Sequence, residues 1–359
     1  MRYSWLAAGA AALLALGVAA CGSSNSSSSS GSGGSLTGAG ATFPAPFYSE
    51  LASQVKSKDD LTVNYNAVGS GAGLAQFTQK TVDFGASDPP LKPDELAAAK
   101  TAGGTDPVQI PTVLGAITIS YTVSGVKSGL KLDGATIADI FSGKITKWND
   151  AKIASQNSGV TLPSTDITTC HRSDSSGTTK NFTTYVAAYD STWEKNIGVD
   201  KTVKWPGGTG AKGNDGVAAC VKQNDGGVGY VEQAYALQNK FNTAAVKNKS
   251  GAYIEPTLAS TSAAADGVEV AADNTFKPLD SPNAKAYPIT ATTYLLMWQD
   301  ACKAGQSKDN AKNLQTFASF ALGEGQSIAQ QLEYAPLPSN IQAQAQKSVD
   351  GLQCNGSAV

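Results

Sequence analysis

The chain has 359 residues, of which 41% are hydrophobic, and its formal net charge is −2 at pH 7. At roughly 100–200 residues per domain, this length predicts two domains once non-globular segments are set aside. The sequence contains no basic stripe of the kind that binds a phosphate backbone, so nucleic acid is not expected as a partner.

The N-terminus has the pattern of a bacterial lipoprotein signal. Residues 1–20 combine a short basic start with an apolar run, which is short for a membrane span of about 20 residues. Small residues precede Cys21, as they do where a cysteine is lipidated; an ordinary secretory signal is the alternative. Residues 21–35 are nearly all Ser and Gly, which is typical of a flexible tether. We therefore expect an extracytoplasmic protein anchored to the cell membrane by lipid, palmitate included, at Cys21.

Beyond the tether, predicted strands and helices alternate, which indicates an α/β fold. The predicted strands are 35–38, 61–66, 82–85, 108–123, 166–169, 226–231 and 286–290. The predicted helices are 42–55, 74–80, 93–100, 137–142, 179–189, 217–221, 232–239, 310–322 and 327–332.

Two polar residues stand at predicted helix starts. Thr42 is a suitable N-cap for the first helix, which has Pro44 in its first turn. Asp88 follows a strand and precedes the helix at 93–100, so it could cap that helix, which is the commoner use of such an aspartate.

The segment 170–178, Cys-His-Arg-Ser-Asp-Ser-Ser-Gly-Thr, forms a predicted strand-to-helix turn. Such a turn presents free backbone N–H groups beside hydroxyl and guanidinium donors, which together can hold a tetrahedral oxyanion. A serine hydrolase that uses Ser176 and His171, oriented by Asp174, is the alternative from another class. However, no Gly-x-Ser-x-Gly elbow contains Ser176. We therefore expect no catalytic residue and no enzyme.

Neither a cofactor nor a metal is expected. Gly38 and Gly40 are not followed by the third glycine of a dinucleotide fingerprint, and residues 209–216 lack the Gly-Lys-Ser/Thr triplet of a P-loop. Zinc is a poor alternative because the only histidine is His171 and no CxxC spacing exists.

Ordered motifs along the whole chain resemble the phosphate-binding proteins of bacterial ABC phosphate importers. The motifs lie at 35–46, 82–88, 143–148, 172–178, 203–206, 213–216, 229–232, 287–290 and 334–338. The resemblance implies a periplasmic-binding-protein-like fold of type 2, with a ligand cleft between two α/β domains joined by two crossing strands. The first domain would comprise 36–111 plus 290–359, and the second 112–289. The implied function is capture of inorganic phosphate by a monomer and its delivery to the membrane permease subunits of an ABC importer.

The same resemblance assigns the ligand-binding residues. They are Thr42, Phe43, Ser70, Asp88, Arg172, Ser176, Gly177 and Thr178. Asp174 would orient Arg172, which is expected to supply the only full positive charge at the anion, and His171 is given no role. Phosphate near pH 7 keeps a proton that it can donate to Asp88, whereas sulfate has none. Asp88 is therefore expected to select phosphate, although a binding protein for another tetrahedral oxyanion, such as sulfate, is the alternative.

Four cysteines follow Cys21, and an even number in an exported chain indicates disulfides. Three pairings are possible. We prefer Cys170–Cys220 with Cys302–Cys354, because each pair then stays within one proposed domain.

Overall fold

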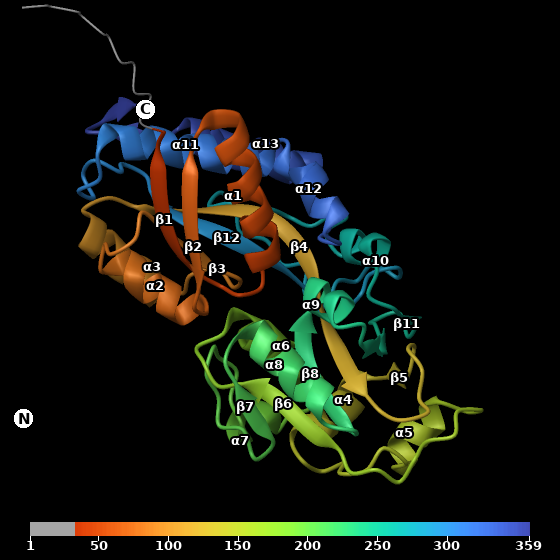
Figure 1. The fold of residues 1–359 in the computed structure, drawn as a ribbon. Helices are drawn as coiled ribbons and strands as arrows, with labels where there is room; N and C mark the ends of the chain where they lie inside the picture. Colours follow the sequence, from red (N-terminus) through yellow and green to blue (C-terminus); the bar gives the residue numbers. More distant parts are fainter. Residues whose placement is uncertain (1–32) are drawn as a thin grey trace, which may run out of the picture. The chain divides into compact units, whose positions relative to one another are not determined.

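The computed structural model describes residues 33–359, which form one compact unit with a mixed α/β fold (Figure 1). The predicted signal peptide at 1–20, the lipidation site Cys21 and the tether as far as residue 32 lie outside the described residues. Within the described range, no helix has the length and apolar character needed to cross a membrane.

One curled, nine-stranded sheet organises the described chain, in the order β2-β1-β3-β12-β4-β8-β6-β7 with β9 beside β4. Its strands are β1 (Ser35–Gly40), β2 (Thr62–Ala67), β3 (Phe84–Ser87), β4 (Pro107–Thr122), β6 (Thr168–Arg172), β7 (Thr209–Ala211), β8 (Gly227–Glu232), β9 (Asn242–Thr243) and β12 (Thr290–Trp298). Two small sheets contain β5 (Lys131–Leu132), β10 (Ala245–Lys247) and β11 (Tyr253–Ile254), and β13 (Gln353–Cys354) and β14 (Ser357–Ala358).

The long strand β4 belongs to two parts of this sheet. Its residues up to Ala116 pair with β12, and from Ile117 onward they pair with β8. We call the strands β2, β1, β3 and β12 the first half of the sheet, and β8, β6 and β7 the second half. Figure 1 shows β4 running from one half into the other. The predicted strand at 108–123 is confirmed. The one at 286–290 is wrong, because regular pairing begins only at Thr290.

Helices cover the sheet. They are α1 (Ala45–Asp59), α2 (Ser70–Thr78), α3 (Pro93–Gly103), α4 (Gly134–Phe141), α5 (Ala151–Gln156), α6 (Gly177–Ala187), α7 (Trp193–Asn196), α8 (Gly213–Gln223), α9 (Gln233–Gln238), α10 (Leu258–Ala263), α11 (Lys308–Leu322), α12 (Gly325–Gln331) and α13 (Ser339–Asp350). Around the first half, α1, α11, α12 and α13 pack together, while α2 and α3 pack as a separate pair (Figure 1).

The core of the first half is built from amphipathic helices and aromatic side chains. On α11 the buried residues Leu314, Phe317 and Ala321 recur every three or four positions, as one apolar helix face requires. Phe317 contacts Tyr48 of α1 and Phe84 of β3, with ring centroids 6.3 and 5.4 Å apart. This packing fixes α1 and β3, whose ends carry polar groups discussed below.

Two disulfides join segments that are distant in sequence. Cys170 of β6 is bonded to Cys220 of α8, with Cα atoms 6.0 Å apart, and Cys302 is bonded to Cys354 of β13, with Cα atoms 4.7 Å apart. These are the pairs preferred from the sequence. The first one ties α8 directly behind the strand that ends at Arg172.

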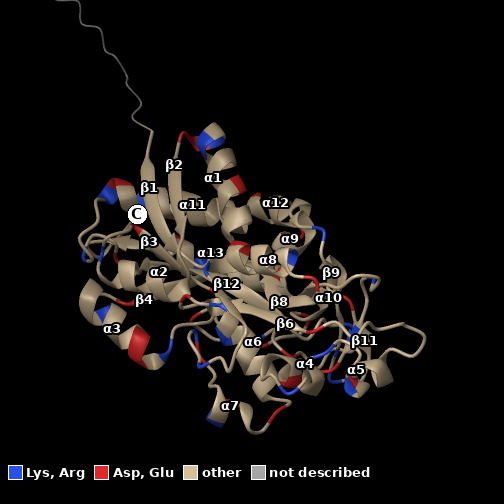
Figure 2. Ribbon diagram, turned by 60° about the horizontal axis from the view of Figure 1, so that its bottom comes forward, with Lys and Arg blue, Asp and Glu red and all other residues tan. Residues whose placement is uncertain are grey.

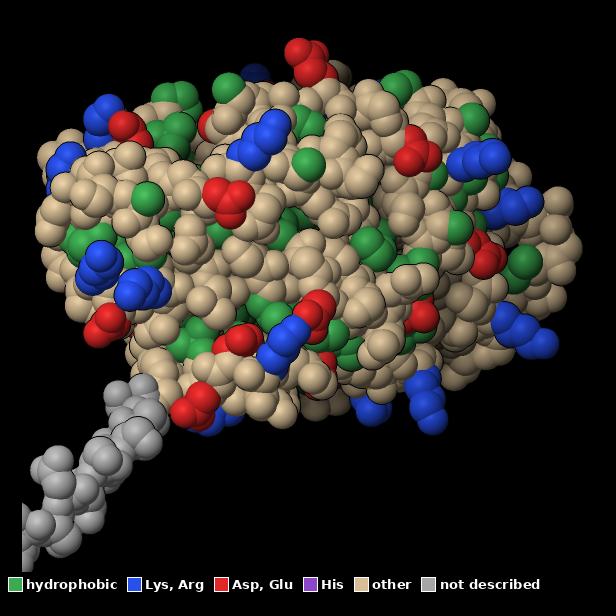
Figure 3. Space-filling view, turned by 90° about the horizontal axis from the view of Figure 1, so that it is seen from above, with side chains coloured by type: hydrophobic (Ala, Val, Ile, Leu, Met, Phe, Trp, Pro, Cys, Tyr) green, Lys and Arg blue, Asp and Glu red, His purple; other side chains and the backbone are tan. Residues whose placement is uncertain are grey.

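Charged side chains are dispersed over the described residues. Figure 2 shows lysine, arginine, aspartate and glutamate distributed over many elements. On the face shown in Figure 3, blue and red side chains are scattered, without a large continuous area of either sign. That face therefore lacks the basic footprint of a nucleic-acid-binding surface.

Candidate functional site

The predicted ligand-binding residues gather where strands of both halves end. In the first half, Thr42 and Phe43 follow β1, Ser70 opens α2 after β2, and Asp88 follows β3. These three strands are parallel, so their carboxyl ends meet at one edge of the sheet. Carboxyl ends of parallel strands are the usual place for a ligand in open α/β sheets.

The second half contributes the other side of the site. Arg172 is the last residue of β6, and Ser176 is the N-cap of α6. The helix therefore begins at Gly177, earlier than the predicted 179. Gly177 and Thr178 lie in its first turn, where backbone N–H groups have no intrahelical acceptor. The positive end of the α6 dipole thus lies beside the guanidinium group of Arg172.

Arg172 is held by a partly buried carboxylate. Its Nε and Nη2 donate to Oδ1 and Oδ2 of Asp174 at 2.7 and 2.5 Å, and its side chain is 1% exposed. The N–H of Gly213, at the start of α8, also donates to Oδ1 of Asp174 at 3.1 Å. Partial burial acts to raise the pKa of Asp174, but the hydrogen bonds and charge of Arg172 outweigh it and hold that pKa below its ordinary value. Asp174 therefore stays ionised and fixes the guanidinium plane.

Asp88 is a buried carboxyl group with one unpaired oxygen. It is 2% exposed; its Oδ2 lies 3.5 Å from the Ser70 hydroxyl, and its Oδ1 has no hydrogen-bond partner among the described residues. Burial raises the pKa of Asp88 to about 7, although the charge of Arg172 and the nearby hydroxyls of Thr293 and Ser70 act to lower it. The capping alternative is wrong: α3 begins after Lys92, whose N–H donates to Glu95 at 2.9 Å. An unpaired buried acceptor is costly unless a ligand donates to it.

Thr42 does not cap α1, contrary to the sequence-based prediction. The N-cap is Pro44, without a side-chain cap hydrogen bond. The Thr42 hydroxyl instead accepts from the second half: the backbone N–H of Asn214 donates to it at 3.2 Å and the side-chain Nδ2 at 2.8 Å. The hydroxyl of Tyr235 donates to the Thr42 carbonyl at 2.6 Å. Thr42 therefore joins the two halves of the sheet.

The two sides of the site lie close together at Gly177. A Cβ atom on Gly177 would lie 2.5 Å from both Asp88 Oδ2 and Ser70 Oγ. The backbone N–H of Gly71 also donates to the carbonyl of Ser175 at 3.0 Å. The absence of a side chain at Gly177 is therefore what lets the first turn of α6 approach Asp88.

Two ion pairs join the two sides of the site. In one pair the lysine comes from the start of α3, and in the other the carboxylate does. Lys92 Nζ lies 2.7 Å from Asp200 Oδ2, and Lys201 Nζ lies 2.6 Å from Glu95 Oε1. Lys201 is only 5% exposed, and its charge acts on Asp88. Lys201 is therefore a second buried cation at the edge of the site, paired with Glu95, while Arg172 is the cation expected to contact the anion itself.

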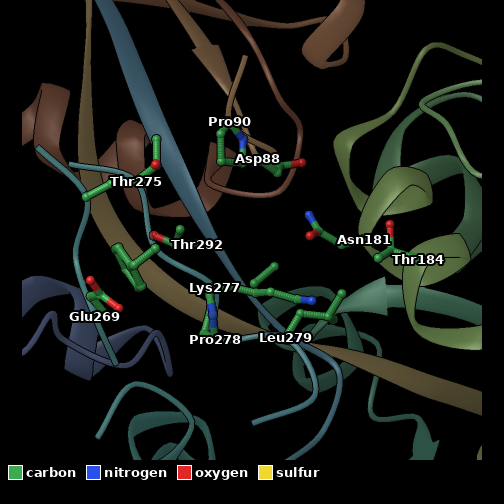
Figure 4. A pocket seen from close by; sticks show the side chains of 13 residues that line it. Asp88, Pro90, Asn181, Thr184, Glu269, Thr275, Lys277, Pro278, Leu279 and Thr292 are labelled. Atoms are coloured by element: carbon green, nitrogen blue, oxygen red, sulfur yellow. The ribbon is translucent and has the colours of Figure 1, made fainter. Parts of the chain in front are cut away.

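A cavity of about 500 Å³ opens beside Asp88 (Figure 4). Figure 4 shows Asp88 on one wall and Asn181 and Thr184, both from α6, on the opposite wall. Lys277 and Glu269 also line it, so its lining carries both signs of charge. The cavity reaches the buried carboxyl group from the side of α6.

The hydrolase arrangement is not formed. The His171 ring stacks on Trp205, with centroids 4.8 Å apart, and its Nδ1 lies 3.2 Å from the Arg172 carbonyl. The Ser176 hydroxyl accepts from the N–H of Thr179 at 3.1 Å, and no hydrogen bond joins it to His171 in the described range. Residues 33–359 also contain no group of three or more His, Cys, Asp or Glu placed to hold a metal ion.

The structure adds residues that sequence reasoning missed, namely Asn214, Lys201 and Tyr235. The sequence predicts a helix only from residue 217, whereas α8 already begins at Gly213, so the motif Gly-Asn-Asp-Gly at 213–216 forms the first turn of the helix and carried no predicted ligand residue. Asn214 is fully buried, and that burial is the signal for a role beyond the turn. No local pattern marks Lys201, because its partner Glu95 is 106 residues away.

Comparisons with known proteins agree with this architecture. A family model described as a PBP superfamily domain matches residues 25–324. The phosphate-binding protein PstS of Xylella fastidiosa is 40% identical over 311 residues, covering 85% of this chain and 82% of that protein. PstS of Haemophilus influenzae is 39% identical over 316 residues, covering 86% and 90%. A solved high-affinity periplasmic phosphate-binding protein with bound phosphate matches with a TM-score of 0.71 at 24% identity, covering 89% of this chain and 99% of that chain. That last likeness shows the fold.

Proposed function

Since this chain belongs to the PBP superfamily and to its family of phosphate-binding proteins, we propose that it captures inorganic phosphate and delivers it to the permease of an ABC importer. The proposed ligand groups are those predicted from the sequence. They are Thr42, Phe43, Ser70, Asp88, Arg172, Ser176, Gly177 and Thr178, with Asp174 orienting Arg172.

The observation that carries the proposal is a set of hydroxyl groups that donate to no protein group in the described part of the chain, on both sides of a site that also contains the unpaired buried oxygen of Asp88. The hydroxyls of Thr42, Ser176 and Thr178 accept hydrogen bonds but donate to no protein group in residues 33–359. The first-turn N–H groups of α6 add further donors, and Oδ1 of Asp88 is unpaired. An anion with several unprotonated oxygens and one proton can accept from these donors and donate to Asp88. Phosphate near neutral pH is such an anion.

Asp88 supports phosphate over sulfate. Its ionised form would repel a fully ionised anion, whereas the proton of phosphate can be shared between the two. Rejection of a ligand that lacks one required hydrogen bond can reach several orders of magnitude, because a buried group is then left unpaired.

Binding would be coupled to closure of two domains. We assign 36–111 with 290–359 to one domain and 112–289 to the other. A hinge is supported near Ala116 and Ile117, where β4 changes its partner strand from β12 to β8. The contacts of Thr42 with Asn214 and of Lys201 with Glu95 join these domains and support a closed form. A decrease in the radius of gyration on adding phosphate, measured by X-ray scattering, is the test of closure.

The remaining assignments concern location and the absence of catalysis. Lipid at Cys21, palmitate included, would hold a monomer on the extracytoplasmic face of the cell membrane beside its permease, and the tether to residue 35 would give it reach. A Cys21→Ser variant that stays in the membrane fraction would contradict the anchor.

We propose no enzymatic activity, since His171 stacks on Trp205 away from Ser176. Turnover of p-nitrophenyl phosphate would contradict that proposal.

The function itself is tested by calorimetry on residues 35–359 with phosphate and with sulfate. Tight binding of phosphate with sulfate at least about a hundredfold weaker is expected from the unpaired Asp88. Equal affinities would favour a general oxyanion-binding protein, and binding of neither anion would overturn the proposal.

A further inference from the structure

Asn214 occupies a position that local sequence patterns do not explain. It is fully buried in the first turn of α8, and three different elements surround its side chain. Its Nδ2 lies 2.8 Å from the Thr42 hydroxyl and 3.4 Å from the Thr178 hydroxyl, which belong to opposite sides of the site. Its Oδ1 accepts from the backbone N–H of Glu232 at 3.0 Å.

The bond from Glu232 fixes which way the amide points. A backbone N–H can only donate, so the oxygen of Asn214 must face it and the NH₂ group must face the two threonines. A flipped amide would place donor against donor. The orientation of Asn214 is therefore set by the end of β8 and does not depend on a ligand.

The donors around each threonine hydroxyl then decide where its proton points. A hydroxyl has one proton and two acceptor lone pairs. Thr42 Oγ1 accepts from both nitrogens of Asn214, at 3.2 and 2.8 Å, so both lone pairs are occupied. Thr178 Oγ1 is approached at 3.4 Å by Nη1 of Arg172 and by Nδ2 of Asn214. In each case only the proton is free to face a ligand.

We propose that Asn214 is a positioning residue for anion binding: its amide holds the hydroxyls of Thr42 and Thr178 as donors toward the anion. This inference rests on the proposed function. It means that Thr42 and Thr178 both present donors to the anion, whereas Asp88 presents an acceptor. Thr42 follows a strand of the first half of the sheet, whereas Asn214 lies on α8, which packs on the second half. The contact between Thr42 and Asn214 therefore joins the two halves and also orients the Thr42 hydroxyl proton toward the anion.

A near-isosteric substitution tests the proposal. Asn214→Asp keeps an oxygen for the N–H of Glu232 but turns the other atom into an acceptor, which draws the protons of Thr42 and Thr178 away from the anion. Calorimetry with inorganic phosphate should show affinity at least about a hundredfold weaker, as expected when a donor is exchanged for a charged acceptor. The matched control is Asn224→Asp at the other end of α8, which adds the same charge away from the site and should change affinity less than about threefold.

A second set of variants separates positioning from a purely structural role. Asn214→Ala should weaken phosphate binding about 10–100-fold in the wild-type background, but less than about threefold in a Thr42→Val, Thr178→Val background, because the hydroxyls through which it acts are gone. An equal loss in both backgrounds, or Asn214→Asp with wild-type affinity, would overturn this inference alone. Wild-type protein that binds neither phosphate nor sulfate would overturn the proposed function together with it.

Discussion

Gly177 and Asp88 face each other so closely that a methyl group on Gly177 would lie 2.5 Å from the Asp88 carboxylate. We predict that Gly177→Ala weakens phosphate binding about 10–100-fold, because overpacking of this size costs about 1–3 kcal/mol unless the two sides separate. Calorimetry measures the loss. Thermal stability of the ligand-free protein should not fall, since alanine is a better helix former than glycine.

The control for that variant is Gly207→Ala. A Cβ atom at Gly207 would have no heavy atom within 4 Å. Its phosphate affinity should match that of the wild type, and equal losses in both variants would contradict the argument from close approach.

The ion pairs Lys201–Glu95 and Lys92–Asp200 should stabilise the closed form. Removing the buried ammonium group with Lys201→Gln leaves Glu95 without its partner and removes a cation from the edge of the site. We predict affinity about tenfold weaker, mainly through faster phosphate release in stopped-flow measurements. Lys56→Gln, which removes an exposed pair with Asp60 at the C-terminal end of α1, is the control. Unchanged release from Lys201→Gln would contradict a role in closure.

The two disulfides should differ in what they affect. Each closes a loop of about 50 residues, so replacing either pair by serines should lower the free energy of unfolding by up to about 4 kcal/mol. Loss of Cys170–Cys220 should also weaken phosphate binding, because it joins the strand that ends at Arg172 to the helix that carries Asn214. Loss of Cys302–Cys354 should not. Denaturant titration and calorimetry on both variants test this, and equal effects on affinity would contradict it.

Burial of Asp88 predicts how the stability of the ligand-free protein depends on pH. Its pKa rises from an ordinary 3.8 to about 7 on folding. The folded state therefore binds the proton more tightly, so stability from this group is present at low pH and is lost as pH rises from about 4 to about 7. Asp88→Asn removes this dependence, and its stability advantage over the wild type should grow by about 2–3 kcal/mol between pH 5 and pH 8.

Urea titrations at both pH values measure that difference after bound anion has been removed. Asp166→Asn, at an exposed side chain, is the control for loss of one negative charge. If the difference in free energy of unfolding between Asp88→Asn and the wild type is the same at pH 5 and pH 8, burial does not disfavour the ionised form of Asp88.

Local patterns predicted much of the fold, whereas the pairing of Arg172 with Asp174 was expected from the resemblance to phosphate-binding proteins. Period-2 and period-3.6 patterns located strands such as β4 and helices such as α11 to within a few residues. Arg172 and Asp174 lie two residues apart, so one short turn contains both the charge and its orienting group. The helix α13 was missed because its apolar face consists of only Ile341, Ala345 and Val349 among glutamines and serines.

Long-range partners could not be predicted in the same way. Thr42 has an ideal residue type for an N-cap, but its hydroxyl is bonded to Asn214, 172 residues away, and tertiary context overrides the local preference. Lys201 had no local signal for the same reason. Asp88 illustrates the reverse case: its position predicted a cap as readily as a ligand group, and burial with an unpaired Oδ1 separates the two.

The most direct measurement of the central claim is the ratio of phosphate to sulfate affinity in the wild type and in Asp88→Asn, determined by calorimetry at pH 8, where Asp88 is ionised and phosphate still keeps one proton. The wild type should prefer phosphate by at least about a hundredfold, because only phosphate donates to the buried carboxylate. Asp88→Asn should bring the two affinities to within about tenfold of each other, since the asparagine amide can donate to either anion. A ratio that is the same in both proteins would contradict the claim that Asp88 decides which anion is bound.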